Sequence, residues 1–131
     1  MPVETECFLP QADRRYLAEH AICTNFVIDS NQHGLIIRDF GLPTGAFQVD
    51  VADILIIVPN GYPDVPPDMF YVDPWLTLKT TGRYAECADQ PLEFSGRRWQ
   101  RWSRHNNEWR TGIDGIRTHL RRVVKALEDA K

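Results

Sequence analysis

Cys87 is the residue whose type and setting best suit covalent chemistry in this sequence. It lies in the run Ala-Glu-Cys-Ala-Asp (85–89), which lacks the apolar pattern of a strand and predicts a partly exposed thiol. An exposed cysteine can act as a nucleophile. The competing interpretation is a small buried hydrophobic side chain, which is the common role of a lone cysteine.

The run Pro-Asn-Gly-Tyr-Pro-Asp-Val-Pro-Pro (59–67) predicts a rigid extended turn. The ring of proline fixes φ and also restricts the residue before it, so Pro63, Pro66 and Pro67 limit the path of the chain here. The aromatic ring of Tyr62 can pin the turn to the domain. We therefore expect these four residues to hold the following strand and loop in place and to shape any site that they border.

The elements that must position these residues are two helices and four strands. The hydrophobic spacing predicts a helix over 11–20, strands over 23–28, 35–40, 46–58 and 69–72, a loop-like segment over 73–110, and an amphipathic helix over 113–130. A slip in alternation at 52–53 predicts a β-bulge, and Thr111 with Asp114 predicts a capping box for the last helix. Helices covering one face of a four-stranded antiparallel meander make an α+β domain.

This order of elements, together with the proline turn, resembles the ubiquitin-conjugating enzymes, whose signature is Tyr-Pro-x-x-Pro-Pro. Cys87 lies 20 residues after Pro67, which is about the spacing of the active cysteine in that family. The blocks 35–40, 61–73 and 99–105 look like the bacterial branch called prokaryotic family E. The resemblance covers roughly residues 10–130 of the sequence.

The resemblance implies acyl transfer through Cys87. A ubiquitin-like modifier would pass from an activating enzyme to this thiol and then to an acceptor, and a metal-dependent deconjugating protease is often a further partner. Trp102 and His105 would flank the site. No metal or organic cofactor is implied, because the activating enzyme would consume the ATP.

One departure from the family concerns the His-Pro-Asn triplet that usually lies about ten residues before the cysteine, because Thr77-Leu78-Lys79 occupies that stretch here. The asparagine of that triplet supports the oxyanion or orders the loop, so another group must act. His105, the only histidine of the loop-like segment, could orient, donate or accept a proton near Cys87. Alternatively, His105 hydrogen-bonds the loop backbone.

The composition indicates one globular domain. The 131 residues are 43% hydrophobic and 25% charged, with a formal charge of −3, and we expect a single ubiquitin-conjugating-like domain over 1–131 with a flexible stretch over 1–9. The charge is uneven: residues 1–82 hold four basic and eleven acidic side chains, and residues 83–131 hold eleven basic and seven acidic ones. Arginines of the second part could therefore pair with acids of the first or bind an acidic patch on a partner.

Three other features limit the function. The cysteines are odd in number, form no Cys-x-x-Cys pair and show no zinc spacing, so Cys7 and Cys23 are interpreted as structural. No signal or membrane-length apolar run is visible, which favours a cytoplasmic protein without a membrane partner.

The arginines interleaved with tryptophans over 97–110 could form a nucleic-acid stacking surface, but the acidic total charge disfavours nucleic acid. A buried tryptophan cluster beneath the loop is the simpler interpretation. A catalytically inactive docking module of the same fold, which binds a ubiquitin-like protein or an assembly partner, remains the alternative function. The feature that separates the two functions is whether Cys87 is exposed beside the segment 99–105 or packed against the last helix.

Overall fold

The fold combines two helices with one antiparallel sheet. The computed structural model of the chain describes residues 9–20, 25–105 and 108–131. In chain order the elements are α1 (Gln11–Glu19), β1 (Phe26–Asp29), β2 (Gly34–Gly41), β3 (Val51–Ile57), β4 (Phe70–Asp73), β5 (Gln90–Phe94), β6 (Arg97–Trp102) and α2 (Ile116–Glu128). The expected α+β class is confirmed. The predictions for Cys7 and Cys23 concern residues outside the described ranges.

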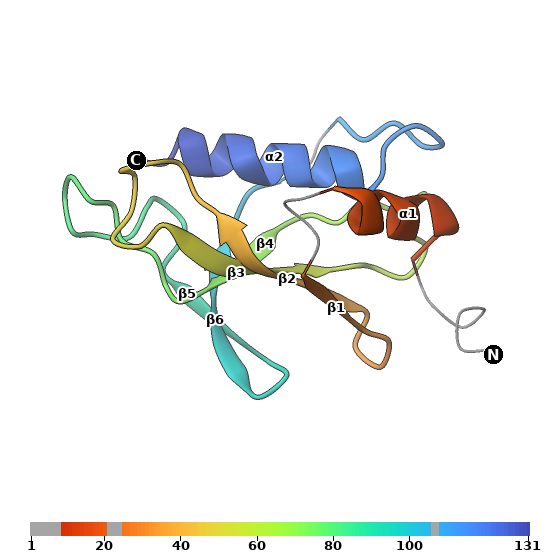
Figure 1. Cartoon of the computed structure of the whole chain (residues 1–131), viewed down its shortest axis with the longest axis horizontal. Helices are drawn as coiled ribbons and strands as arrows, with labels where there is room; N and C mark the ends of the chain where they lie inside the picture. Colours follow the sequence, from red (N-terminus) through yellow and green to blue (C-terminus); the bar gives the residue numbers. More distant parts are fainter. Residues whose placement is uncertain (1–8, 21–24, 106–107) are drawn as a thin grey trace.

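The sheet has six strands in the order β1-β2-β3-β4-β6-β5, and every neighbouring pair is antiparallel (Figure 1). Strands β1 to β4 follow one another as expected, but the segment 73–110, expected to be loop-like, contains the β5–β6 hairpin. The turn between the two strands has positive φ at Ser95 (53°) and Gly96 (74°), as a two-residue type I′ turn requires. The sequence of β6, Arg-Arg-Trp-Gln-Arg-Trp, lacks a clear alternation of apolar and polar residues, because the buried position 100 is a glutamine.

The predicted bulge exists in this part of the sheet but lies on the other strand. The register between β2 and β3 shifts between Ile37 and Phe40, so β2 carries the additional residue. Asp39 has a φ of 51°, and its N–H donates to the carboxylate of Asp53 on β3 at 3.0 Å. The slip in alternation at 52–53 therefore marks the position opposite the irregularity. Strand β3 begins only at Val51, later than expected.

Both helices pack on the same face of the sheet (Figure 1). Alternate residues of β3, Ile54 and Ile56, contribute to the main core with Leu120 and Val123 of α2, whereas Leu55 points to a smaller cluster on the opposite face. This alternation is what a strand buried on both faces produces. Burial of each such side chain stabilises the fold by roughly 1.5–3 kcal/mol.

The start of α2 differs from the expected capping box. The helix begins at Ile116, and Asp114 accepts a hydrogen bond from the Arg110 N–H at 2.8 Å instead of capping the helix. The first N–H of α2, that of Ile116, donates to the carboxylate of Asp13 at 3.2 Å. Because Asp13 belongs to α1, the cap comes from 103 residues away in sequence and local pattern could not reveal it.

Candidate functional site

Cys87 lies exposed on the turn 85–88, and its thiol is free of a disulfide. Two backbone hydrogen bonds hold this turn: the Ser103 N–H donates to the Cys87 carbonyl at 3.0 Å, and the Glu86 N–H donates to the Lys131 carbonyl at 3.0 Å. The turn is therefore attached to the end of β6 on one side and to the segment after α2 on the other. The prediction of an exposed thiol is confirmed.

The backbone of Cys87 has a φ of 56°, which lies in the left-handed region. A non-glycine residue there costs of order 1 kcal/mol or more, so the surrounding hydrogen bonds must hold it. This conformation presents the side chain outward while the carbonyl points back to Ser103. Within the described residues no side chain hydrogen-bonds the thiol, so the backbone alone positions it.

Gln100, on β6, is the residue beneath this turn that the sequence analysis did not single out. Its side chain is fully buried, and its amide nitrogen donates to the carbonyls of Ala88 at 2.8 Å and Leu76 at 3.1 Å. Its amide oxygen accepts from the Leu76 N–H at 2.8 Å and from Trp102 Nε1 at 3.0 Å. All four positions of the amide are used, so Gln100 joins the residue after Cys87 to two other parts of the fold.

Trp102 serves as part of the core. Its ring is fully buried, stacks on Phe70 with centroids 5.4 Å apart, and carries the guanidinium of Arg104 5.0 Å above it. Trp99 is also fully buried, on the other face of the sheet. Trp99 and Trp102 are buried as expected, but they lie in two separate cores on opposite faces of the sheet and do not form one cluster. These two rings cannot stack on bases.

The proline turn is attached to α1 and to the segment that leads into α2. The hydroxyl of Tyr62 donates to Asp13 at 2.5 Å, and Trp109 Nε1 donates to the carbonyl of Pro63 at 2.7 Å. Burial first, and then the hydrogen bond and the charge of Asp13, raise the pKa of Tyr62, so the phenol stays protonated and remains a donor. Pro67 is buried and Pro66 half-buried. Within the described residues no hydrogen bond joins this turn to Cys87.

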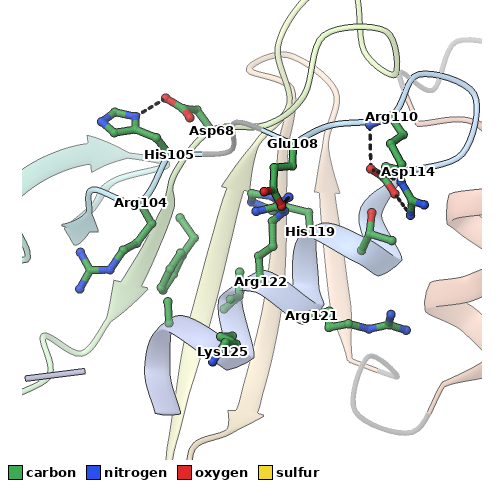
Figure 2. Close-up of a pocket in the computed structure, with 14 residues that line it drawn as sticks. Asp68, Arg104, His105, Glu108, Arg110, Asp114, His119, Arg121, Arg122 and Lys125 are labelled. Atoms are coloured by element: carbon green, nitrogen blue, oxygen red, sulfur yellow. Dashed lines mark hydrogen bonds and ion pairs between the residues drawn. The ribbon is translucent and has the colours of Figure 1, made fainter. Parts of the chain in front are cut away.

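His105 contacts Asp68 rather than Cys87. Its Nδ1 lies 3.1 Å from the Asp68 carboxylate, and both side chains are more than half exposed. Figure 2 shows this pair at one end of a groove above α2. His105 follows Ser103 by two residues, and Ser103 is the residue whose N–H binds the Cys87 carbonyl. The alternative that His105 bonds the loop backbone is not observed among the described residues.

Arg97 joins the basic and acidic parts of the sequence. Its guanidinium lies 2.8 Å from Asp53 and 2.6 Å from Asp73, and stands 4.3 Å above the ring of Trp99. Both aspartates belong to the acidic first part of the chain. The expectation that arginines pair across the two parts is therefore confirmed for Arg97. This pairing attaches the β5–β6 hairpin to β3 and β4.

Neither a metal site nor a membrane span is found among the described residues. Across residues 9–20, 25–105 and 108–131 no three His, Cys, Asp or Glu side chains gather as a metal site would need. No helix in this part of the chain has the length and apolar character to cross a membrane.

Comparison with known proteins gives one match. The model of the family described as prokaryotic E2 family E matches residues 9–130, which is nearly the whole chain. No curated protein and no solved structure matches significantly. The family match agrees with the resemblance carried by the proline turn and by the block around Trp102.

Proposed function

The chain belongs to prokaryotic E2 family E, and we propose that it carries a ubiquitin-like modifier as a thioester on Cys87 between an activating enzyme and an acceptor. The observation that supports this most directly is the exposed, unpaired thiol on a turn held by backbone hydrogen bonds. A carrier thiol must be reached by two large partners in succession. An exposed turn with no covering side chain suits that requirement.

The proposed step is a pair of acyl transfers. The sulfur of Cys87 attacks the carbonyl carbon of the modifier's C-terminal thioester, a new C–S bond forms, and the activating enzyme's thiol leaves with the proton that Cys87 loses. An acceptor amine or hydroxyl then attacks the same carbon, the C–S bond to Cys87 breaks, and the Cys87 thiol regains a proton. ATP is spent earlier, by the activating enzyme.

We assign the proton transfer of the second step to His105. Asp68 holds Nδ1 of the ring, which leaves Nε2 to accept the proton of the attacking acceptor. The role accounts for the absence of the usual His-Pro-Asn triplet, since another group must assist the attack. Replacing His105 with Gln should slow discharge of the thioester to free lysine at least about tenfold and leave its formation unchanged. Asp68→Asn should act in the same direction.

The partners follow from the same assignment. A family of E2-like proteins works with a ubiquitin-like modifier and an activating enzyme in general. A metal-dependent deconjugating protease, which would remove the modifier from its acceptor, is proposed as a third partner on the resemblance alone.

The decisive test incubates the protein with an activating enzyme and a ubiquitin-like modifier from the same organism, together with ATP. A thioester on Cys87 gives an adduct that a thiol reductant removes. The Cys87→Ser variant should give an adduct that resists the reductant, because an oxyester replaces the thioester, and Cys87→Ala should give none. An adduct that forms unchanged in Cys87→Ala would overturn the proposal.

One observation favours a second function, a docking module without catalysis. No described side chain hydrogen-bonds the thiol, whereas His105 binds Asp68. Such a module would bind the modifier equally well as wild type and as Cys87→Ala, with no adduct in either. Titration calorimetry of both proteins with the modifier therefore separates binding from acyl transfer.

A further inference from the structure

A basic groove lies between α2 and the chain segment that leads into it (Figure 2). Its volume is about 700 Å³, within the range of ligand sites in proteins. Five cationic side chains line the groove: Arg104, Arg110, Arg121, Arg122 and Lys125. Three carboxylates, from Asp68, Glu108 and Asp114, also line it. Cys87 is not part of the lining.

The positive charge in this groove is only partly neutralised. Asp114 is committed to Arg110, at 2.9 Å, with a side chain only 6% exposed. Glu108 meets Arg122 at 4.0 Å, the limit of an ion pair, and its side chain is 86% exposed. Arg121 is exposed and makes no hydrogen bond or ion pair with any described residue. Arg121 and Arg122 are therefore available to an anionic ligand.

His119, on the same helix, adds an unused hydrogen-bond acceptor to the groove lining. The residue is 3% exposed, and its Nε2 lies 3.3 Å from the carbonyl of Met69. A carbonyl only accepts, so Nε2 carries the proton and Nδ1 carries a lone pair. Nδ1 is buried and has no partner among the described residues. Buried polar atoms are normally paired, so an orphan in the lining of a groove indicates a missing donor.

We propose that this groove binds an acidic peptide segment of a partner protein, whose carboxylates pair with Arg121 and Arg122 and whose backbone N–H donates to Nδ1 of His119. A peptide supplies both kinds of group at short intervals along one chain. Glu108 and Arg122 lie beside His119 (Figure 2). A ligand carboxylate that replaces Glu108 on Arg122 would bring the backbone of the ligand next to His119.

The lining favours an acidic peptide over a nucleic acid. Three carboxylates in the groove would repel a continuous run of phosphates. The lining offers few rings on which bases can stack, because Phe70 is only 2% exposed and the exposed ring of His105 is held by Asp68. A peptide with acidic and neutral residues in alternation can avoid the carboxylates of the groove while it reaches the two arginines.

The first test measures fluorescence anisotropy with a labelled, end-blocked peptide that alternates glutamate and glycine. The double variant Arg121→Gln, Arg122→Gln should raise the Kd at least about fivefold, since each partly exposed ion pair contributes modestly. Arg117 is the matched control, because it is an exposed arginine of α2 that lines a different pocket. Arg117→Gln should change the Kd less than about twofold.

Two outcomes of this test would overturn the proposal. Equal weakening by Arg117→Gln and by the double variant would mean that general charge attraction, not the groove, binds the peptide. Tighter binding of a short oligouridylate than of the acidic peptide would assign the groove to nucleic acid. A peptide that alternates glutamine and glycine should not bind. If it bound with the same Kd as the acidic peptide, the charge pairing would also be refuted.

The second test isolates the donor to His119. Sarcosine in place of glycine together with N-methylglutamate in place of glutamate removes all the backbone N–H groups of the peptide, and this should weaken binding to the wild type about threefold but leave binding to His119→Phe unchanged. An equal loss on both proteins would refute the hydrogen bond to Nδ1. The proposal does not depend on the thioester, so Cys87→Ser should bind the peptide as the wild type does. A fivefold loss in Cys87→Ser would show that the peptide binds at the thiol.

Discussion

Two buried polar side chains, Gln100 and Asp13, each connect segments that are far apart in the sequence, at different places in the fold. Gln100 is fully buried and joins the turn after Cys87 to Leu76 and Trp102. Asp13 is 9% exposed and joins α1 to Tyr62 of the proline turn and to the start of α2. One of them is neutral and the other is a carboxylate.

The difference in charge between the two side chains follows from the hydrogen-bonding groups that surround each of them. The segments around Gln100 present two carbonyls and two N–H groups, so only an amide, which donates and accepts, can satisfy them all. The groups around Asp13 are both donors, the Tyr62 hydroxyl and the Ile116 N–H, and the second lies at the positive end of the helix dipole. A carboxylate is the matching acceptor there.

The larger loss of stability is expected on replacing Gln100, the neutral residue. Gln100→Leu keeps a similar volume but leaves buried donors and acceptors unpaired at Leu76, Ala88 and Trp102, which should lower the free energy of unfolding by about 4 kcal/mol. Urea denaturation measures the change. Gln90→Leu, at an exposed position of β5, is the control and should cost less than about 0.5 kcal/mol. A loss below about 1 kcal/mol in Gln100→Leu would mean that the amide is not the support of this turn.

The parts of the fold that the sequence predicted are those with a local signal. The apolar spacing of α2, the prolines of the turn and the strands up to β4 each carry a period or a fixed φ. Strand β6 lacks such a signal, because Arg97 and Gln100 make their contacts with distant segments. Its hydrophobic alternation is therefore interrupted at two positions, and β6 was expected to be loop.

The residues that support the candidate site were missed for a related reason. Gln100 lies between Trp99 and Trp102, and that setting in an aromatic run is the one hint that its side chain is inside. Asp13 is the third residue of α1, in a turn that looks exposed in the sequence, and only its tertiary contacts with Tyr62 and Ile116 distinguish it from a solvent-facing acid. The exposure of Cys87 could be predicted because its neighbours are small or charged.

His119 extends the comparison to a buried group that can change its charge. Burial, with a smaller contribution from the charge of Arg122, lowers the pKa of His119 from its ordinary 6.5 to about 4, and the hydrogen bond to the Met69 carbonyl and the charge of Asp68 oppose this shift. The unfolded chain therefore binds a proton at this residue over a pH window in which the folded chain does not. The free energy of unfolding should fall as the pH drops from 6.5 to 4, by about 3 kcal/mol from this residue alone.

The measurement that checks this is urea denaturation across the same pH range for the wild type and for His119→Phe. The variant should lose this part of the pH dependence, whereas His20→Phe, at an exposed position, should keep it. Parallel pH profiles for the wild type and His119→Phe would show that His119 is not protonated on unfolding. A buried neutral amide such as Gln100 should contribute nothing to the profile.

The smallest loss of stability is expected on replacing Asp13, the charged residue that was compared with Gln100. Asp13→Asn retains one oxygen that can accept from Ile116 or from Tyr62, and it removes the negative charge near the start of α2, so the free energy of unfolding should fall by about 1 kcal/mol. Asp129→Asn, an exposed change at the other end of α2, is the matched control and should have a smaller effect in urea denaturation. If Asp13→Asn cost more than Gln100→Leu, the ranking would reverse, and the charge that caps α2 would matter more to this fold than the amide beneath Cys87.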